Sequence, residues 1–280
     1  MRRELGYVHI AVLLFGLSGL FAKWLTISAY VIVLGRVFFA AIFLWLVLII
    51  ISKPVLLPNY KNYLPFIFIG GVLAIHWGSF FHSIQISTVA IGLVTFATFP
   101  VFASLLEPII FNEKYDKRTF VLATMTVVGV IFIVPVDLSS EVTQGVIWGL
   151  VSAVTFTILS ILNRKYVRNY SSITVGFYQN LFAFFWLIPF TLFIPFTITS
   201  SDFSLLLLLG VLFTGVAHVV YIQGLSKVNV RSASIIASLE PVYGILAAII
   251  LLREMPIWNE WVGMGVILFS AMYISLKKQT

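Results

Sequence analysis

The sequence contains no cysteine and very little charge. Without cysteine the chain cannot form a disulfide, use a thiol nucleophile or hold an iron–sulfur centre. Only 10% of its 280 residues are charged, whereas soluble domains carry about 25%. So few charged residues cannot cover the surface of one large soluble core. With 61% hydrophobic residues, the chain is expected to be an integral membrane protein.

Signals for catalysis and for processing are missing as well. No Walker A pattern is present, so the chain is not expected to hydrolyse ATP. Asp116, Asp137 and Asp202 all fall in predicted loops, which argues against an intramembrane enzyme with converging acidic groups. Histidines on different segments without cysteine make only a weak metal site. We therefore expect no enzyme activity, no cofactor and no metal. Tyr7–Trp24 is followed by no cleavage pattern, so it is interpreted as a retained membrane span.

The apolar residues form ten continuous segments, each long enough to cross the roughly 30 Å hydrocarbon core of a bilayer as a helix. The segments are 6–24, 29–51, 62–82, 87–111, 119–136, 142–163, 172–194, 203–224, 230–252 and 257–276. Because the links between them are short, the sequence predicts one compact all-α bundle of ten transmembrane helices.

Basic residues are concentrated in one set of links. If the N-terminus is cytoplasmic, nearly all lysines and arginines fall in cytoplasmic links, with Lys23 and Arg253 as the outside exceptions and Arg36 inside a segment. The positive-inside rule then predicts a multi-pass protein of the inner (plasma) membrane with both termini in the cytoplasm. This topology accounts for the net charge of +7, so no nucleic-acid partner is needed to explain it.

The two halves of the chain repeat one pattern. Pro100 and Pro241 are each followed, at the same spacing, by a glutamate at the end of the segment, Glu113 and Glu254. Each half holds five segments, an odd number, so the halves are predicted to insert upside down relative to each other. We predict two inverted five-helix repeats, residues 1–138 and 139–280. Inverted repeats are typical of alternating-access transporters whose substrate site lies near the middle of the membrane.

These features resemble a known family. Five plus five segments, Leu34–Arg36 early in the second segment, and Leu239–Pro241 followed by Arg253-Glu254 are similar to EamA-type members of the drug/metabolite transporter (DMT) superfamily. The resemblance covers the whole chain. It implies a central cavity lined mainly by the first, third, fourth, sixth, eighth and ninth segments. It also implies transport of amino acids and other small metabolites, often outward.

Two charged residues lie within the segments. Glu240 is near mid-depth in the ninth segment, where a charge costs at least about 2.5–3.5 kcal/mol and usually faces a protein interior or a water-filled cavity. It either orients an amine group of the substrate, or titrates, or makes a permanent structural pair. Arg36, in the outer third of the second segment, either binds a substrate carboxylate or ties two helices together.

The imidazole and aromatic candidates for substrate binding are His218, Tyr221, His76, Trp77 and Phe80. His218 shares a polar helical stripe with Tyr221 and Thr214, and His76 shares a face with Phe80. Intramembrane histidines can carry protons or donate to anions, so proton coupling is open, and simple packing is the alternative. Pro100 and Pro241 are expected to be equivalent hinge points.

Other polar residues have simpler expected roles. Glu107 near the cytoplasmic end of the fourth segment is expected to cap a helix or to lie beside a gate. Tyr178, Gln179 and Asn180 in the seventh segment are expected to make interhelical hydrogen bonds, and no more than two of them can face one site.

The sequence therefore predicts a secondary-active or facilitative transporter that exports small amino-acid-like or amphipathic metabolites by alternating access. A sugar-nucleotide carrier is an alternative, but its anionic substrates would favour several basic residues at mid-depth, and only Arg36 is available away from the segment ends. A carrier of drugs or quaternary amines is a second alternative within the superfamily. An intramembrane enzyme or a scaffold subunit would be a different class, and a scaffold has no need of two inverted halves. The expected partners are a small-molecule substrate and the lipid bilayer, and the chain acts as a monomer or a homodimer.

Overall fold

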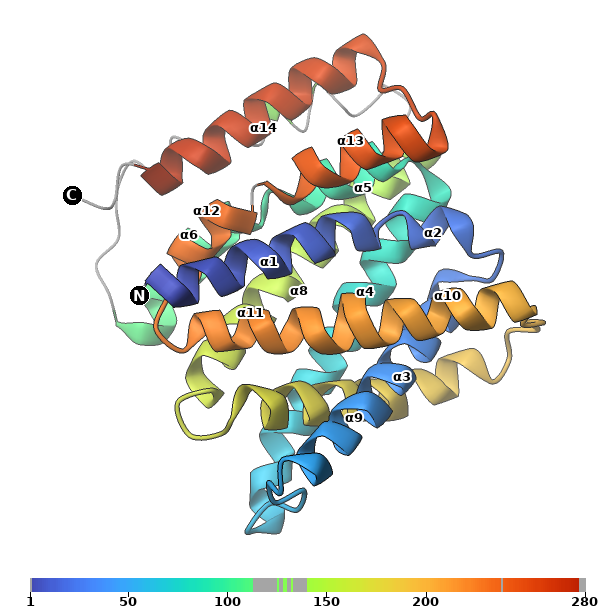
Figure 1. Ribbon diagram of the computed structural model, residues 1–280. Helices are drawn as coiled ribbons and strands as arrows, with labels where there is room; N and C mark the ends of the chain where they lie inside the picture. The colour runs from blue at the N-terminus through green and yellow to red at the C-terminus, as the bar shows by residue number, and fades with distance from the viewer. Residues whose placement is uncertain are drawn as a thin grey trace.

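The computed structural model describes residues 2–112, 140–237 and 239–276, together with residues 125, 128, 129 and 132. Every element in these ranges is a helix, and none is a strand (Figure 1). The α-helices are α1 (Arg2–Ser18), α2 (Phe21–Trp24), α3 (Ala29–Ile50), α4 (Leu64–Ile86), α5 (Val89–Phe96), α6 (Phe99–Phe111), α8 (Glu141–Tyr166), α9 (Ser172–Thr191), α10 (Ser200–Gly210), α11 (Ala217–Leu225), α12 (Val230–Ala237), α13 (Glu240–Leu252) and α14 (Trp258–Leu276). A 3₁₀-helix, η1 (Tyr60–Tyr63), precedes α4, and a π-helix, η2 (Val211–Val216), joins α10 to α11.

Seven helical stretches in the described ranges are long and apolar enough to cross a membrane. They are Arg3–Trp24, Ala29–Ile50, Tyr60–Ile86, Val89–Phe111, Glu141–Tyr166, Ser172–Thr191 and Ser200–Leu225. Each matches a predicted segment to within a few residues, which confirms a multi-span all-α membrane protein. The ninth predicted segment is divided into α12 and α13, and the tenth is α14. The fifth, 119–136, lies mostly outside the described residues, so the count of ten spans stays a prediction.

Helix starts are capped by side chains close to them in sequence. The hydroxyl of Thr88 accepts from the backbone N–H of Ile91 at the start of α5, and Ser140 and Ser171 do the same for α8 and α9. Because a bilayer offers no water to free backbone groups, such local caps satisfy donors that the helix itself cannot.

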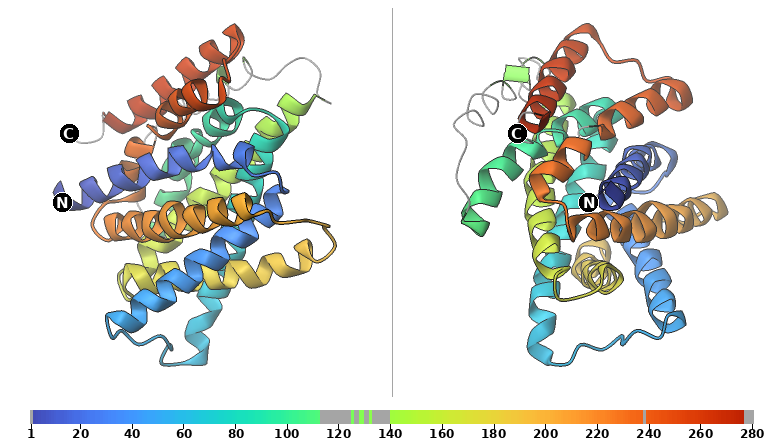
Figure 2. Two further views of the ribbon diagram at one scale, coloured as in Figure 1. Left: turned by 45° about the vertical axis from the view of Figure 1, so that its right-hand side comes forward. Right: turned by 60° about the vertical axis from the view of Figure 1, so that its left-hand side comes forward.

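Helix α1 lies in the middle of the bundle. It contacts α11 on one side and α13 on the other, and it keeps this place in each view of Figures 1 and 2. The approach to α13 is close because Gly16 has no side chain: a Cβ there would lie 2.7 Å from the backbone oxygen of Glu240. Helix α14 packs on α12, and it ends on the side of the molecule where α1 begins (Figure 1).

Two broken helices, α5–α6 and α12–α13, have the same design. Both contain a first piece of 8 residues and a second piece of 13 residues. Pro100 and Pro241 are each the second residue of the second piece, so they follow the break rather than kink a continuous helix. The second pieces end in left-handed residues, Asn112 with φ 53° and Arg253 with φ 58°. Glu113, the predicted counterpart of Glu254, lies outside the described residues, and the hinge role of the two prolines stays a prediction.

Candidate functional site

Arg36 on α3 is completely buried at the centre of the bundle. Its Nε donates to Oγ1 of Thr214 at 2.9 Å, and Nη2 reaches the backbone oxygen of Phe213 at 3.4 Å. Its guanidinium carbon lies 3.5 Å from the ring centroid of Trp77. Nη1 has no hydrogen-bond partner among the described residues. Arg36 therefore ties α3 to η2, as the structural interpretation predicted. Its Nη1 can still donate a hydrogen bond to a bound solute.

The π-helix η2 presents Thr214 to Arg36. The hydroxyl of Thr214 donates to the backbone oxygen of Leu209, five residues earlier, at 2.7 Å. Its oxygen therefore remains free to accept from Arg36. Gly210 allows α3 to approach at this point, since a Cβ there would lie 2.8 Å from the backbone oxygen of Arg36.

His218 on α11 lies directly beside this group. Its Nδ1 is 2.9 Å from Nε2 of Gln179 on α9, and its ring stacks on Trp77 with centroids 5.6 Å apart. With the amide of Gln179 as donor, Nδ1 accepts and Nε2 carries the ring proton. Nε2 of His218, Nε1 of Trp77 and Oε1 of Gln179 are buried and lack partners in the described part of the chain.

Glu240 is the first residue of α13 and is buried. The positive end of the α13 dipole favours a carboxylate at this place. Glu240 interacts electrostatically with Arg36, and its Oε2 has no hydrogen-bond partner within the described ranges. The centre of the bundle thus holds an arginine and a glutamate side chain, each with a buried polar atom that lacks a hydrogen-bond partner among the described residues.

Aromatic rings surround these polar groups. Tyr221 on α11 lies 5.7 Å from Phe15 and 5.6 Å from Phe156 between ring centroids, and its hydroxyl is 3.3 Å from Oγ of Ser160. Phe15 also meets the ring of His218 edge-on at 5.3 Å. The sequence interpretation missed Phe15, because nothing distinguishes it from the other phenylalanines of the chain.

His76 and Phe80 on α4 extend the aromatic wall. Nδ1 of His76 lies 3.1 Å from the backbone oxygen and 3.0 Å from Oγ of Ser152 on α8. Phe80 packs against Trp77 and Phe96, with ring centroids 5.6 Å away in each case. His76 is therefore held by α8, whereas His218 keeps a nitrogen available.

We use the name central cluster for Arg36, Trp77, His218, Gln179, Glu240, Tyr221 and Phe15. Every member is buried, and they come from α1, α3, α4, α9, α11 and α13. The structure thus brings together five of the predicted substrate-binding residues with two that were not among them, Gln179 and Phe15. Of Tyr178, Gln179 and Asn180, Gln179 is the one whose side chain bonds His218, whereas Tyr178 bonds Val55 and Asn180 bonds Gly176.

A separate cavity of about 400 Å³ lies between α4, α8 and α9. None of the described residues that line it is charged, and the hydroxyl of Ser79 in its wall already donates to its own helix. Phe68, Ile75 and Phe190 in its lining are more than half exposed. This apolar recess faces the outside of the bundle, and no member of the central cluster lines it.

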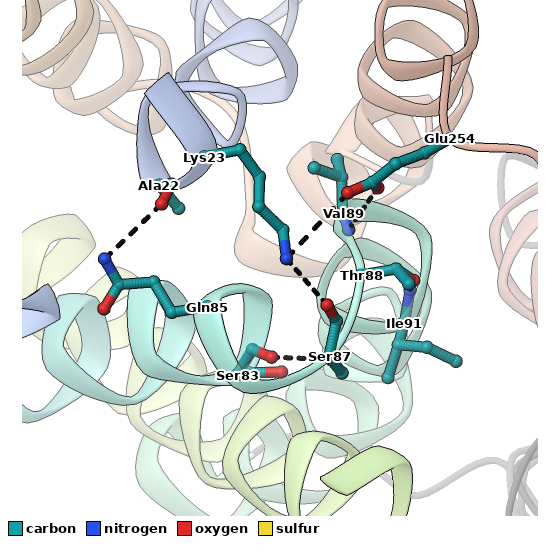
Figure 3. A network of polar contacts seen from close by, with 9 residues as sticks. All are labelled: Ala22, Lys23, Ser83, Gln85, Ser87, Thr88, Val89, Ile91 and Glu254. Carbon is teal, nitrogen blue, oxygen red and sulfur yellow. Dashed lines mark hydrogen bonds and ion pairs between the residues drawn. The ribbon is translucent and has the colours of Figure 1, made fainter. Parts of the chain in front are cut away.

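A polar network joins the two halves on one face of the bundle (Figure 3). Nζ of Lys23, at the end of α2, donates to the backbone oxygen of Ser87 at 2.7 Å and lies 3.9 Å from Oε1 of Glu254. Oε2 of Glu254 accepts from the backbone N–H of Val89, the first residue of α5, at 2.9 Å. We call these three contacts the Lys23 clamp, and the face on which they lie the Lys23 face.

A second network lies where α6 ends and α12 begins. Oε1 of Glu107 is 2.5 Å from Nη1 of Arg164 on α8 and accepts from the backbone N–H of Val230, the first residue of α12, at 2.9 Å. The guanidinium of Arg164 lies 4.5 Å from the ring centroid of Phe111. We call this network the Arg164 clamp. It shows that Glu107 caps a helix, one of the two roles expected from the sequence.

The two clamps also show how the broken helices run. The end of α13 meets the start of α5 at the Lys23 clamp, and the end of α6 meets the start of α12 at the Arg164 clamp. Helix α12 packs on α6, and α13 packs on α5. The broken helices are therefore antiparallel, and the two clamps lie at opposite ends of the pair.

Comparison with known proteins identifies the family. The model of the "EamA-like transporter family" matches the chain twice, at residues 3–134 and 143–276. "Uncharacterized transporter YxxF" of Bacillus subtilis is 23% identical over 96% of this chain and 88% of its own length. The "S-adenosylmethionine uptake transporter" of Rickettsia prowazekii is 28% identical over 49% of this chain and 46% of its own. A solved crystal structure with a TM-score of 0.70 and 16% identity covers 96% of this chain and 94% of that one, which shows a shared fold. The chain belongs to the EamA-like transporter family of the DMT superfamily, whose members are transporters and not enzymes.

Proposed function

We propose that this transporter exports small amino-acid-like solutes, which bind in the central cluster and cross by alternating access. One observation carries the proposal. Two buried polar atoms of the central cluster, Nη1 of Arg36 and Oε2 of Glu240, lack hydrogen-bond partners among the residues that the structure describes. A zwitterionic amino acid offers the two complementary groups, a carboxylate and an ammonium.

The energetic argument rests on those unpaired atoms. A buried polar group without a partner costs about 1–3 kcal/mol, and more if it is charged. A substrate carboxylate would accept from Nη1 of Arg36 and from Nε2 of His218 or Nε1 of Trp77. A substrate ammonium would donate to Glu240. Binding would then relieve costs that the empty protein already carries, and it would discriminate against solutes that lack either charge.

The aromatic rings fit the remainder of such a solute. Phe15 packs against Trp77 and Tyr221 and with them provides apolar faces beside Arg36, whose guanidinium lies over the Trp77 ring. A second candidate substrate is an amino acid that carries a sulfonium and an adenine, because aromatic faces attract cations and stack on bases. The relative from Rickettsia prowazekii bears the name of a transporter of this kind. Sugar nucleotides are less suitable, because Arg36 is the one basic member of the cluster.

Alternating access is supported by the paired design of the two halves. The family model matches each half once, and α5–α6 and α12–α13 are antiparallel copies. We extend this to two inverted five-helix repeats, residues 1–138 and 139–280, with ten spans in all. The charge bias of the links supports an inner-membrane location with both termini in the cytoplasm. The outward direction rests on the family resemblance alone.

The test is flux in proteoliposomes that contain the full chain and a panel of radiolabelled amino acids. Uptake and efflux are both measured, with and without a pH gradient, which also tests proton coupling. Glu240→Gln should reduce zwitterion flux about tenfold, the change expected from losing one charged hydrogen bond. Glu141→Gln is the matched control, because Glu141 is an exposed carboxylate in the first turn of α8.

Two results would contradict the proposal. If no member of the panel moves in well-folded protein, the assigned substrate class is wrong. If Glu240→Gln transports at the rate of the unaltered protein, Glu240 has a structural role only, and the charge complementarity described above does not govern binding.

A further inference from the structure

The Lys23 clamp and the Arg164 clamp have their cations and their capped helix starts at equivalent positions of the two halves. Their carboxylates are not equivalent, because Glu254 corresponds to Glu113 and Glu107 corresponds to Ala248. Lys23 and Arg164 are 141 residues apart, and so are Val89 and Val230. In each clamp the cation and the capped N–H belong to one half, and the carboxylate comes from the other. At the ends of the broken helices, the two clamps therefore hold one half of the chain against the other.

Both clamps are closed in this structure, and the central cluster is buried. Arg36 is 0% exposed, Glu240 2% and His218 3%. A solute can reach these side chains only if the bundle opens on one face. Opening on the Lys23 face requires the end of α13 to leave the start of α5, which breaks the bond between Glu254 and Val89. Opening on the opposite face requires the end of α6 to leave the start of α12, which breaks the bond between Glu107 and Val230.

The chemistry of the clamps suits reversible release. When Glu254 or Glu107 separates, the backbone N–H at the helix start and the carboxylate both lie at the end of a span, where interfacial water can hydrate them. The same separation in the middle of the membrane would leave those groups without partners. The free-energy cost of opening is therefore small, because each group exchanges a hydrogen bond within the protein for one with water.

We infer that the Lys23 clamp and the Arg164 clamp are two gates that open in turn, with Glu254 and Glu107 as their positioning residues. This inference rests on the proposed alternating-access function, but it does not depend on the identity of the solute. Its rival is that the clamps are permanent ties. A permanent tie would weaken the whole bundle when broken, whereas a gate would expose one face and leave the other closed.

The natural absence of cysteine makes a solvent-access test direct. Single cysteines are placed at Ser104 on α6 and at Ile245 on α13, which are buried and occupy equivalent positions of the two halves. The full chain is reconstituted in nanodiscs, where both faces meet a water-soluble maleimide. The rate of labelling at each cysteine then reports opening at the gate beside it, and no substrate is required.

Glu254→Gln should raise the labelling rate of Ile245→Cys about tenfold and leave that of Ser104→Cys unchanged, as expected from losing one charge-assisted hydrogen bond. Glu107→Gln should have the opposite pattern. Asp202→Asn is the matched control, because it makes the same change at the start of α10 outside both clamps, and it should alter neither rate.

The inference is wrong if either glutamine variant changes both reporters equally or changes neither. Should Glu254→Gln fail to fold, Lys23→Gln breaks the same clamp and is judged by the same two rates. If each glutamine variant changes labelling on one face only, and no amino acid of the panel is transported, the gates are supported and only the proposed substrate is wrong. If each variant changes both labelling rates equally, and amino acids are transported, the substrate is supported and the gates are wrong.

Discussion

Replacing Arg36 by methionine should weaken substrate binding strongly while changing the stability of the protein only slightly. The substitution removes the 2.9 Å hydrogen bond to Thr214, a longer one to Phe213, and the contact with the Trp77 ring. Hydrogen bonds to charged groups contribute about 1.5–3 kcal/mol each, and a desolvated cation–π contact about 2 kcal/mol. These losses are opposed by relief of the desolvation of a fully buried guanidinium, which is several kcal/mol.

Glu240 loses its cationic neighbour, but a buried carboxyl group can take a proton instead of remaining charged. The substitution leaves few other new unsatisfied groups. The hydroxyl of Thr214 still donates to the backbone oxygen of Leu209 at 2.7 Å, and methionine fills much of the space of the arginine stem. The opposing contributions should therefore nearly cancel, to within about 1–2 kcal/mol. For a chain of this size that corresponds to a change in melting temperature of only several degrees.

Binding should respond differently. The carboxylate of a bound amino acid would lose its bond to Nη1 of Arg36, worth about 1.5–3 kcal/mol, so the Kd should rise roughly 10- to 150-fold. The Kd of Arg36→Lys should lie between those of the unaltered protein and Arg36→Met, because lysine keeps the charge but not the planar guanidinium with its several donors.

Thermal unfolding followed by tryptophan fluorescence, combined with binding of the amino acid that gives the highest flux, measures both effects on one sample. A fall of more than about 10 °C in melting temperature with unchanged Kd would refute the reasoning. Arg36 would then serve only to hold α3 against η2.

Two further predictions concern the scaffold. Gly16→Ala should lower the free energy of unfolding by about 1–3 kcal/mol, because the new Cβ would lie 2.7 Å from the backbone oxygen of Glu240. Gly265→Ala is the control and should not lower it, because no described atom lies within 4 Å of the new Cβ. Equal melting temperatures of the two variants would show that α1 and α13 can move apart freely. Asp202→Ala should cost about 1 kcal/mol by removing the capping box with Thr199 at the start of α10; chemical denaturation measures it, and an unchanged midpoint would mean that this cap is replaced by water.

Much of the fold could be predicted because the bilayer restricts the choice. A span must be about 20 apolar residues long and must satisfy its own backbone, so apolar runs translate directly into helices. A break in the helix near Pro241 could be anticipated from the proline. That the first piece ends at Ala237 and the second begins at Glu240 could not. The π-helix Val211–Val216 was not predictable, since an apolar run reads the same in either helical form.

The site was predictable only where burial is expensive. Arg36 and Glu240 were identified because an ionisable side chain inside a membrane span is costly and therefore usually functional or paired. Both lie in the central cluster. Phe15 and Gln179 carry no such signal, and only the packing of α1 and α9 against α11 reveals them. The bond between Glu254 and Val89 joins residues 165 positions apart, and no local pattern specifies a contact of that length.

The two clamps share the positions of their cations and of their helix starts, but they differ in strength. Glu107 is 0% exposed and lies 2.5 Å from Arg164, whereas Lys23 and Glu254 are 25% and 24% exposed and 3.9 Å apart. Partly exposed pairs contribute about 0–1 kcal/mol, and their attraction weakens as the salt concentration rises. The empty protein should therefore rest with its Lys23 face the easier to open, and the salt concentration on that side should set how often a solute is admitted from it.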